Sequence, residues 1–169
     1  MKKILIFVVL ISSTIFAETH NDKPFEVQKS FEIVYDKNTS CLVRNFKLYK
    51  DPKWVAKIEV RSGKTAYFSS PKSLFEFYHR PGKWFDMGVK SERDFSQIVV
   101  IDYNTLKAID AEQAFFVYGS RAISPAGDDL VPFATKEDAE AFAKTHSGKR
   151  IFKFDEVKDA LIRLLNGRI

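Results

Sequence analysis

The alternation of apolar and polar residues predicts several short strands. Residues 54–60 place apolar side chains on one phase and mostly polar side chains on the other, a period of two that is typical of a half-buried strand. Ser62-Gly63 has the composition of a two-residue hairpin turn, so residues 65–68 are expected to return as the partner strand. Further strands are expected at residues 42–48, 98–101, 114–118, 130–133 and 151–154.

Three helices are predicted from capping residues and from apolar residues at helical spacing. Ser70 can cap a helix whose first residue is Pro71, where the missing backbone N–H has no cost. Thr135 opens a sequence that resembles a capping box, which predicts a second helix over residues 136–145. A final amphipathic pattern predicts a C-terminal helix over residues 156–166.

Two stretches of this pattern match each other. From Phe68 the chain reads FSSPKSLFEFYH, and from Phe133 it reads FATKEDAEAFAK, with apolar residues at the same offsets. The sequence therefore predicts an α+β fold of two related ββαβ units packed together, at about residues 41–102 and 108–155, with an additional C-terminal helix. The residues expected to be buried are Trp54, Ile58, Phe68, Leu74, Phe77, Val100, Phe133 and Phe142.

The N-terminal segment predicts export. Residues 1–17 combine a positive start, an apolar run and the small residue Ala17, which is the layout of a cleavable signal peptide. The run is too short to span a bilayer, so we expect no membrane span in the mature chain. Residues 18–40 are expected to form an extended lead-in to a domain over residues 41–169. Cys41, the one cysteine, does not follow the signal directly, so no lipoprotein cysteine is expected.

Charge and composition exclude other classes. The net charge of +5 comes from cations interleaved with acidic residues, without a basic run of five, which argues against nucleic-acid binding. The acidic pairs Asp128-Asp129 and Asp155-Glu156 are more typical of a solvated turn and a helix start than of a catalytic pair. No nucleophile with a base is recognisable, so we expect no enzyme.

Three longer blocks resemble the NosL family, the accessory proteins of nitrous-oxide reductase. The blocks read YKDPKWVAKIEVRSGKTAYFSSPKSLFEFY, VVIDYNTLKAIDAEQAFFVYGS and LVPFATKEDAEAFAKTHSGK, and the resemblance runs from about Cys41 to Val157. It implies a periplasmic domain of two ββαβ units, related in fold to organomercurial lyase. It also implies delivery of Cu(I) to nitrous-oxide reductase or to its maturation machinery.

The chain departs from the family at the metal-binding segments. The family has a Cys-x-x-Cys-Gly-Met segment; in this chain, Arg44 stands at the position of its second cysteine and Phe46 at that of its methionine. The family also has a Gly-Pro-Met-Gly turn, and Ala126 stands at the position of that methionine. Cu(I) prefers soft donors, so the resemblance implies a copper site that is altered or lost. Cys41 is the one thiolate left, and an extended segment would point it away from residues 44 and 46. The other soft donors are His20, His79, Met87 and His146, without HxxxH or CxxC spacing.

Three hypotheses remain open. The first is a NosL-like accessory protein, nominally for Cu(I) delivery, with an altered site. The second is a metal-free partner-binding module, and the third is a thiol enzyme that uses Cys41, which is otherwise a small buried hydrophobe. The segments that supply ligands in the family must approach each other, so we predict an ion pair of Arg44 with Asp128 or Asp129 in place of the metal. The alternative is that these are unrelated surface charges.

Overall fold

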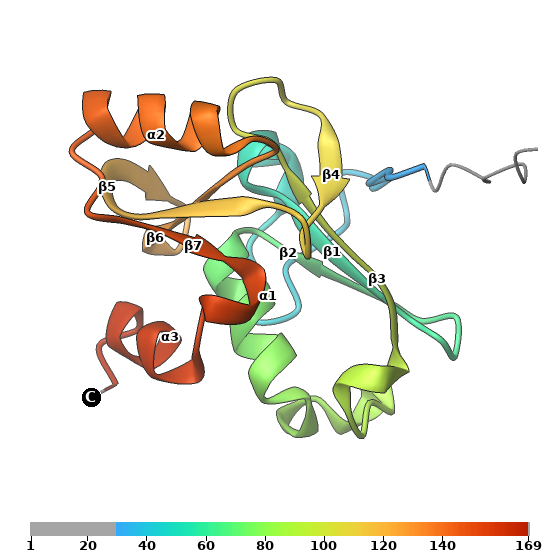
Figure 1. Cartoon of the computed structure of the whole chain (residues 1–169). Coiled ribbons are helices and arrows are strands. Elements are labelled where there is room, and N and C mark those ends of the chain that lie inside the picture. The colour runs from blue at the N-terminus through green and yellow to red at the C-terminus, as the bar shows by residue number, and fades with distance from the viewer. Residues whose placement is uncertain (1–29, 169) are drawn as a thin grey trace, which may run out of the picture.

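The computed structural model describes residues 30–168, which form a mixed α/β fold with two antiparallel sheets and three α-helices (Figure 1). The expected signal peptide, most of the lead-in and His20 lie outside the described residues. In the described part of the chain, no helix is long and apolar enough to cross a membrane.

The first sheet has the strand order β2-β1-β3-β4. Its strands are β1 (Ala56–Val60), β2 (Thr65–Phe68), β3 (Phe95–Ile101) and β4 (Ala108–Asp110). The helix α1 (Pro71–His79) lies between β2 and β3 in the chain. Ala56 pairs with Phe68 on one side and with Val100 on the other, so β1 is central and its side chains are almost all buried.

The second sheet has the order β6-β5-β7. Its strands are β5 (Phe115–Ser124), β6 (Gly127–Phe133) and β7 (Arg150–Lys153), followed along the chain by α3 (Asp159–Leu165). The helix α2 (Lys136–Thr145) lies between β6 and β7 in the chain and packs on this sheet. Both sheets therefore place the first strand of a strand-strand-helix-strand series in the middle.

Short 3-10 helices occupy many of the connections. They are η1 (Leu48–Lys50), η2 (Pro52–Trp54), η3 (Pro81–Lys83), η4 (Phe85–Met87), η5 (Glu92–Asp94) and η6 (Phe154–Glu156). The expected helix over 156–166 consequently begins later, at Asp159, because η6, the non-helical Val157 and an extended Lys158 precede it. β5 and β6 extend to Ser124 and Gly127, well beyond the predicted strand ends.

The expected strand over residues 42–48 is wrong. The chain turns there, with the Cys41 N–H donating to the Phe46 carbonyl at 2.8 Å and the Asn45 N–H donating to the Cys41 carbonyl at 2.8 Å. Asn45 has a φ of 59°, a left-handed conformation that Asn adopts more readily than most residues. A single bridge between Ser40 and Lys47 closes the turn.

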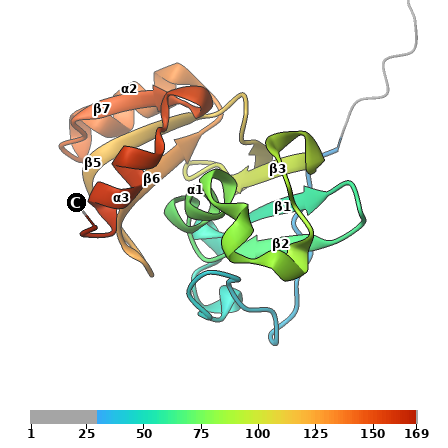
Figure 2. The same ribbon diagram turned by 90° about the horizontal axis from the view of Figure 1, so that it is seen from below.

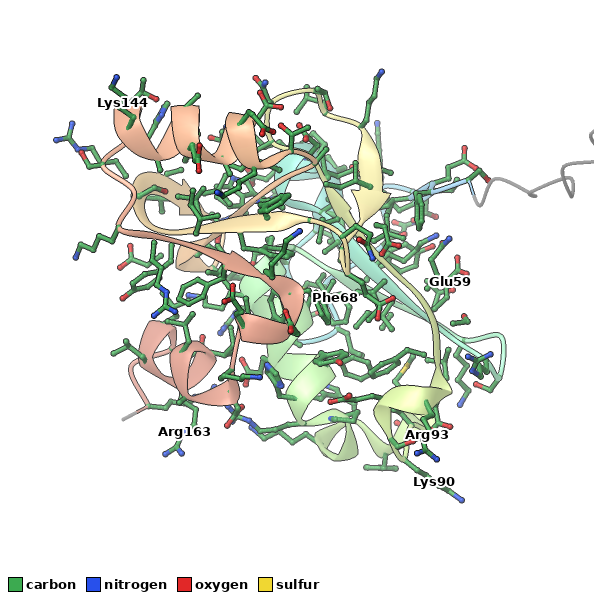
Figure 3. All side chains as sticks on the ribbon, viewed as in Figure 1. Glu59, Phe68, Lys90, Arg93, Lys144 and Arg163 are labelled. Carbon is green, nitrogen blue, oxygen red and sulfur yellow. The ribbon has the colours of Figure 1, made fainter. Side chains whose placement is uncertain are left out.

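α1 joins the two sheets through a core rich in phenylalanine. The Phe75 ring lies 5.2 Å from Phe116 of the second sheet, and Phe77 lies 5.5 Å from Phe68 of the first (centroid distances). Figure 2 shows α1 between the two sheets, and Figure 3 shows Phe68 inside and Lys144 and Arg163 at the periphery. All eight residues expected to be buried are confirmed, none being more than 8% exposed.

Candidate functional site

The first turn of α1 holds a buried carboxylate from β6. Ser70 caps the helix by accepting from the Ser73 N–H at 3.2 Å, and Asp129 Oδ1 accepts from the Lys72 N–H at 2.7 Å. Asp129 also accepts from the Ser124 hydroxyl at 2.6 Å and from the Leu130 N–H at 2.8 Å. A negative side chain is favourable at the N-terminus of a helix, so Asp129 fastens the β5–β6 hairpin to α1.

The ammonium group of Lys72 lies beneath the turn over residues 124–127. Its Nζ donates to the Ala126 carbonyl at 2.6 Å and to the Leu165 carbonyl at 3.2 Å, and the Lys72 residue is 2% exposed. Burial lowers the pKa of Lys72, although the charge of Asp129 acts in the opposite direction. Burial raises the pKa of Asp129 in spite of its hydrogen bonds. The hairpin is thus held to α1 by the Lys72 ammonium group at its turn and by the Asp129 carboxyl group on β6.

Glu76, one turn further along α1, collects three cationic side chains. Its carboxylate, 3% exposed, accepts from Arg168 Nη1 at 2.6 Å and from Arg44 Nη2 at 3.4 Å, while Lys83 Nζ lies at 3.8 Å. Burial alone would raise the pKa of Glu76, but the hydrogen bond from Arg168 and the surrounding positive charges hold it below its ordinary value. Asn166 also donates to Glu76, at 3.0 Å.

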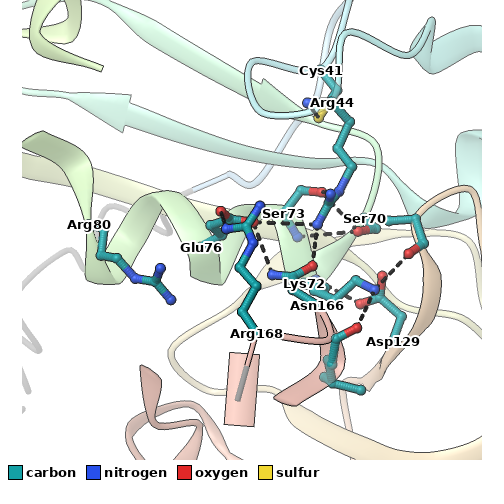
Figure 4. A network of polar contacts seen from close by, with 12 residues as sticks. Cys41, Arg44, Ser70, Lys72, Ser73, Glu76, Arg80, Asp129, Asn166 and Arg168 are labelled. Carbon is teal, nitrogen blue, oxygen red and sulfur yellow. Dashed lines mark hydrogen bonds and ion pairs between the residues drawn. The ribbon is translucent and has the colours of Figure 1, made fainter. Parts of the chain in front are cut away.

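Arg44 enters this arrangement from the turn over residues 41–46. Its Nε donates to the Ser73 hydroxyl at 3.3 Å, and its Nη2 donates to both Glu76 and the Asn166 side-chain oxygen. Figure 4 shows these side chains converging from four separate segments on one face of α1. We call the following residues the α1 polar cluster: Arg44, Ser70, Lys72, Ser73, Glu76, Ser124, Asp129, Asn166 and Arg168.

Cys41 lies at the edge of the cluster and is 2% exposed. Its Sγ accepts from the Arg44 backbone N–H at 3.3 Å. The condition under which residues 41 and 44 would point to opposite sides, an extended segment, is not met, because the segment is a turn and not a strand. Phe46 is 44% exposed, so its side chain faces solvent in part.

The predicted ion pair of Arg44 with Asp128 or Asp129 is also wrong. Among residues 30–168, the one ion pair of Arg44 is with Glu76. Asp129 is already satisfied by hydroxyl and backbone donors, and Asp128 is exposed. Sequence reasoning missed Lys72, Glu76, Asn166 and Arg168; a glutamate between Phe75 and Phe77 on a buried helix is the signal that could have indicated Glu76.

The other soft donors lie in unrelated places. His79 Nε2 is 2.8 Å from the Val157 carbonyl, and burial lowers the pKa of His79. The His146 ring stacks on Phe142 at 4.0 Å, and Met87 belongs to η4. Within the described residues, no group of three or more His, Cys, Asp and Glu side chains is placed to hold a metal ion.

The fold and the polar cluster define a two-sheet α/β domain whose halves meet at the first turn of α1. The model of the NosL family matches residues 32–162. The chain therefore belongs to the NosL family, as its resemblance to that family predicted.

Two relatives support the same assignment. The copper-binding lipoprotein NosL of Stutzerimonas stutzeri is 38% identical over 55 residues, which span 32% of this chain and 28% of that protein. The crystal structure of the copper chaperone NosL from Shewanella denitrificans superimposes with a TM-score of 0.66 at 24% identity, over 79% of this chain and 99% of that chain. This structural likeness shows that the two proteins share a fold.

Proposed function

We propose that this chain is a periplasmic accessory protein that serves nitrous-oxide reductase or its maturation machinery. Membership of the NosL family supports this role, and so do the two relatives, a copper-binding lipoprotein and a copper chaperone. The proposal includes a cleavable signal peptide over residues 1–17. It also includes an origin of the two strand-strand-helix-strand series by duplication, which their equivalent strand order supports.

We further propose that the family's copper site is altered in this chain. The observation that carries this proposal is the fixed position of Arg44, bound to Ser73, Glu76 and Asn166. Lys72 supplies a second cation, against the carbonyl of Ala126. A unit charge about 4 Å from a Cu(I) ion would oppose binding by about 4 kcal/mol at an effective dielectric constant of 20.

The geometry supports a metal-free partner-binding role best. The side chains of the α1 polar cluster already join the 41–46 turn, the 124–127 turn and α1, so the arrangement needs no metal bridge. Delivery of Cu(I) by Cys41 is the second candidate, favoured because Cys41 is the one thiol of the chain and stands at the first cysteine of the family's metal-binding segment. A thiol enzyme is less favoured, because Cys41 is buried and, among the described residues, no histidine is hydrogen-bonded to it.

Anaerobic Cu(I) titration against a competing chelator separates these roles. We expect weak binding by the wild type, and loss of any residual binding in Cys41→Ser. The triple variant Arg44→Cys, Phe46→Met, Ala126→Met restores the family's donors and should bind one Cu(I). The matched control Arg44→Ser, Phe46→Leu, Ala126→Leu changes the same positions without sulfur. Tight stoichiometric binding by the wild type that persists in Cys41→Ser would contradict the proposal.

A further inference from the structure

The end of α3 directs the chain back toward α1. Gly167 has a φ of 65°. The Arg168 N–H donates to the Arg163 carbonyl and the Gly167 N–H donates to the Leu164 carbonyl, both at 2.9 Å, which is the hydrogen-bond pattern of a Schellman motif. This C-terminal turn places Arg168 on the same side as Asn166, facing the α1 polar cluster.

Three residues at the C-terminal end of α3 and just beyond it, Leu165, Asn166 and Arg168, tie this segment to α1. The Leu165 carbonyl accepts from Lys72 Nζ, Asn166 bridges Glu76 and Arg44, and Arg168 pairs with Glu76 at 2.6 Å. Arg44 is therefore held between the helix and the C-terminal segment. Because Arg44 belongs to the 41–46 turn, the same contacts fix that turn.

The contacts of Glu76 with Arg168 and Arg44 join partly exposed cations to a buried carboxylate. The Arg168 side chain is 49% exposed and the Arg44 side chain is 21% exposed, whereas Glu76 is 3% exposed. Solvent-exposed partners exchange with water more readily than buried ones, so Arg168 is the partner that we expect to release Glu76 first. The match to the NosL family ends at residue 162, so Asn166 and Arg168 lie outside the matched region.

We propose that residues 165–168 form a C-terminal latch that holds the 41–46 turn against α1 and controls its opening. This proposal rests on the proposed function in one respect, which is that the 41–46 turn, with Arg44, corresponds to the family's metal-binding segment. Release of the segment removes the Asn166 contact of Arg44 and the Arg168 partner of Glu76, so that Arg44 is held by Ser73 and Glu76 alone and the turn opens more readily around Cys41. The latch thus regulates access to the segment in which this chain departs from its family.

Cys41 reports the opening of the turn. It is the one cysteine of the chain and is 2% exposed, so a thiol reagent in excess reacts with it only after opening. When closing is faster than labelling, the labelling rate is proportional to the open population. The measurement uses no copper, so its outcome is independent of the titration that tests the proposed function.

The sharpest variant is Gly167→Val. A Cβ built on Gly167 meets no heavy atom within 4 Å beyond its chain neighbours, so the substitution acts mainly through the positive φ, which a β-branched residue adopts with strain. Arg168→Ala removes the pairing side chain instead. We expect each variant to raise the labelling rate of Cys41 about tenfold.

Two controls make the experiment decisive. Thr135→Ala removes the N-cap of α2 and lowers overall stability at a distance from the latch. Lys144→Ala removes an exposed cation from the last turn of α2. Unchanged labelling in both latch variants would overturn the proposal. An equal rise in Thr135→Ala would also overturn it, because labelling would then follow global unfolding.

Discussion

Replacement of Glu76 by glutamine tests whether one buried carboxylate holds the α1 polar cluster together. Its oxygens accept from Arg168 Nη1 at 2.6 Å and from Asn166 Nδ2 at 3.0 Å, and a third hydrogen bond comes from Arg44. Glutamine keeps one acceptor oxygen. Its NH2 group is a donor and would face the guanidinium groups of Arg168 and Arg44, which are donors themselves. The variant therefore loses charge-assisted hydrogen bonds and leaves Arg44 without a carboxylate.

The structure sets the size of the effect. Hydrogen bonds to charged groups contribute about 1.5–3 kcal/mol each, but the share of Arg168 is discounted because its side chain is 49% exposed. We expect the free energy of unfolding at pH 7 to fall by about 2–3 kcal/mol, measured by urea unfolding followed by circular dichroism. Glu140→Gln is the matched control: this exposed helical glutamate pairs with Lys136 at 3.1 Å, and its loss should cost less than about 0.5 kcal/mol.

The pH dependence provides a second test of the same variant. The folded-state pKa of Glu76 lies below its ordinary value of 4.5. A lowered folded-state pKa gives stability that is present above the unfolded-state pKa and is lost as the pH falls through the folded-state pKa. The difference between wild type and Glu76→Gln should therefore shrink below about pH 4.5. A difference that stays the same from pH 7 to pH 3, or one below about 0.5 kcal/mol at pH 7, would refute the reasoning.

Other substitutions probe the core, a close contact and the hairpin anchor. Phe77→Ala should lower the free energy of unfolding by about 3–5 kcal/mol in urea titrations, since this fully buried ring leaves a cavity. Gly148→Ala places a Cβ 2.6 Å from Val117 Cγ1 and 2.9 Å from Ala143 Cα, so it should cost about 1–3 kcal/mol, seen as a lower Tm. Because burial raises the pKa of Asp129, wild type should gain stability relative to Asp129→Asn as the pH falls through that raised pKa toward 3.8, measured by unfolding across pH.

The elements with strong local signals could be predicted from the sequence. Ser70 and Thr135 cap their helices as expected, each accepting from the backbone N–H three residues on. The hairpin of β1 and β2 is also confirmed, because a period of two is sampled over several residues. Its turn is longer than the expected two residues, since the Val60 N–H donates to the Lys64 carbonyl across residues 61–63. The 41–46 turn was missed because it depends on the left-handed backbone conformation of Asn45. The pattern of apolar and polar residues does not reveal this conformation.

The polar cluster was harder to predict, since its partners are distant in the chain. Arg44 and Asn166 are separated by 122 residues, and Arg44 and Glu76 by 32. The sequence marks Arg44 as a cation at a family metal position, and the acidic pair Asp128-Asp129 directly follows the 124–127 turn. Asp129 was already engaged by the first turn of α1, a contact that depends on how the two sheets pack.

The charge balance of the cluster leads to a further prediction about copper. Its carboxylates are Glu76 and Asp129, and its cations are Arg44, Lys72 and Arg168, so the cluster already carries one net positive charge. Arg44→Cys removes a cation and adds a thiol, whereas Phe46→Met with Ala126→Met adds donors only. Arg44→Cys alone should therefore raise Cu(I) affinity more than the double variant, by at least about tenfold in the anaerobic chelator titration. A larger gain from the double variant would show that donor number, and not the positive charge of Arg44, limits copper binding.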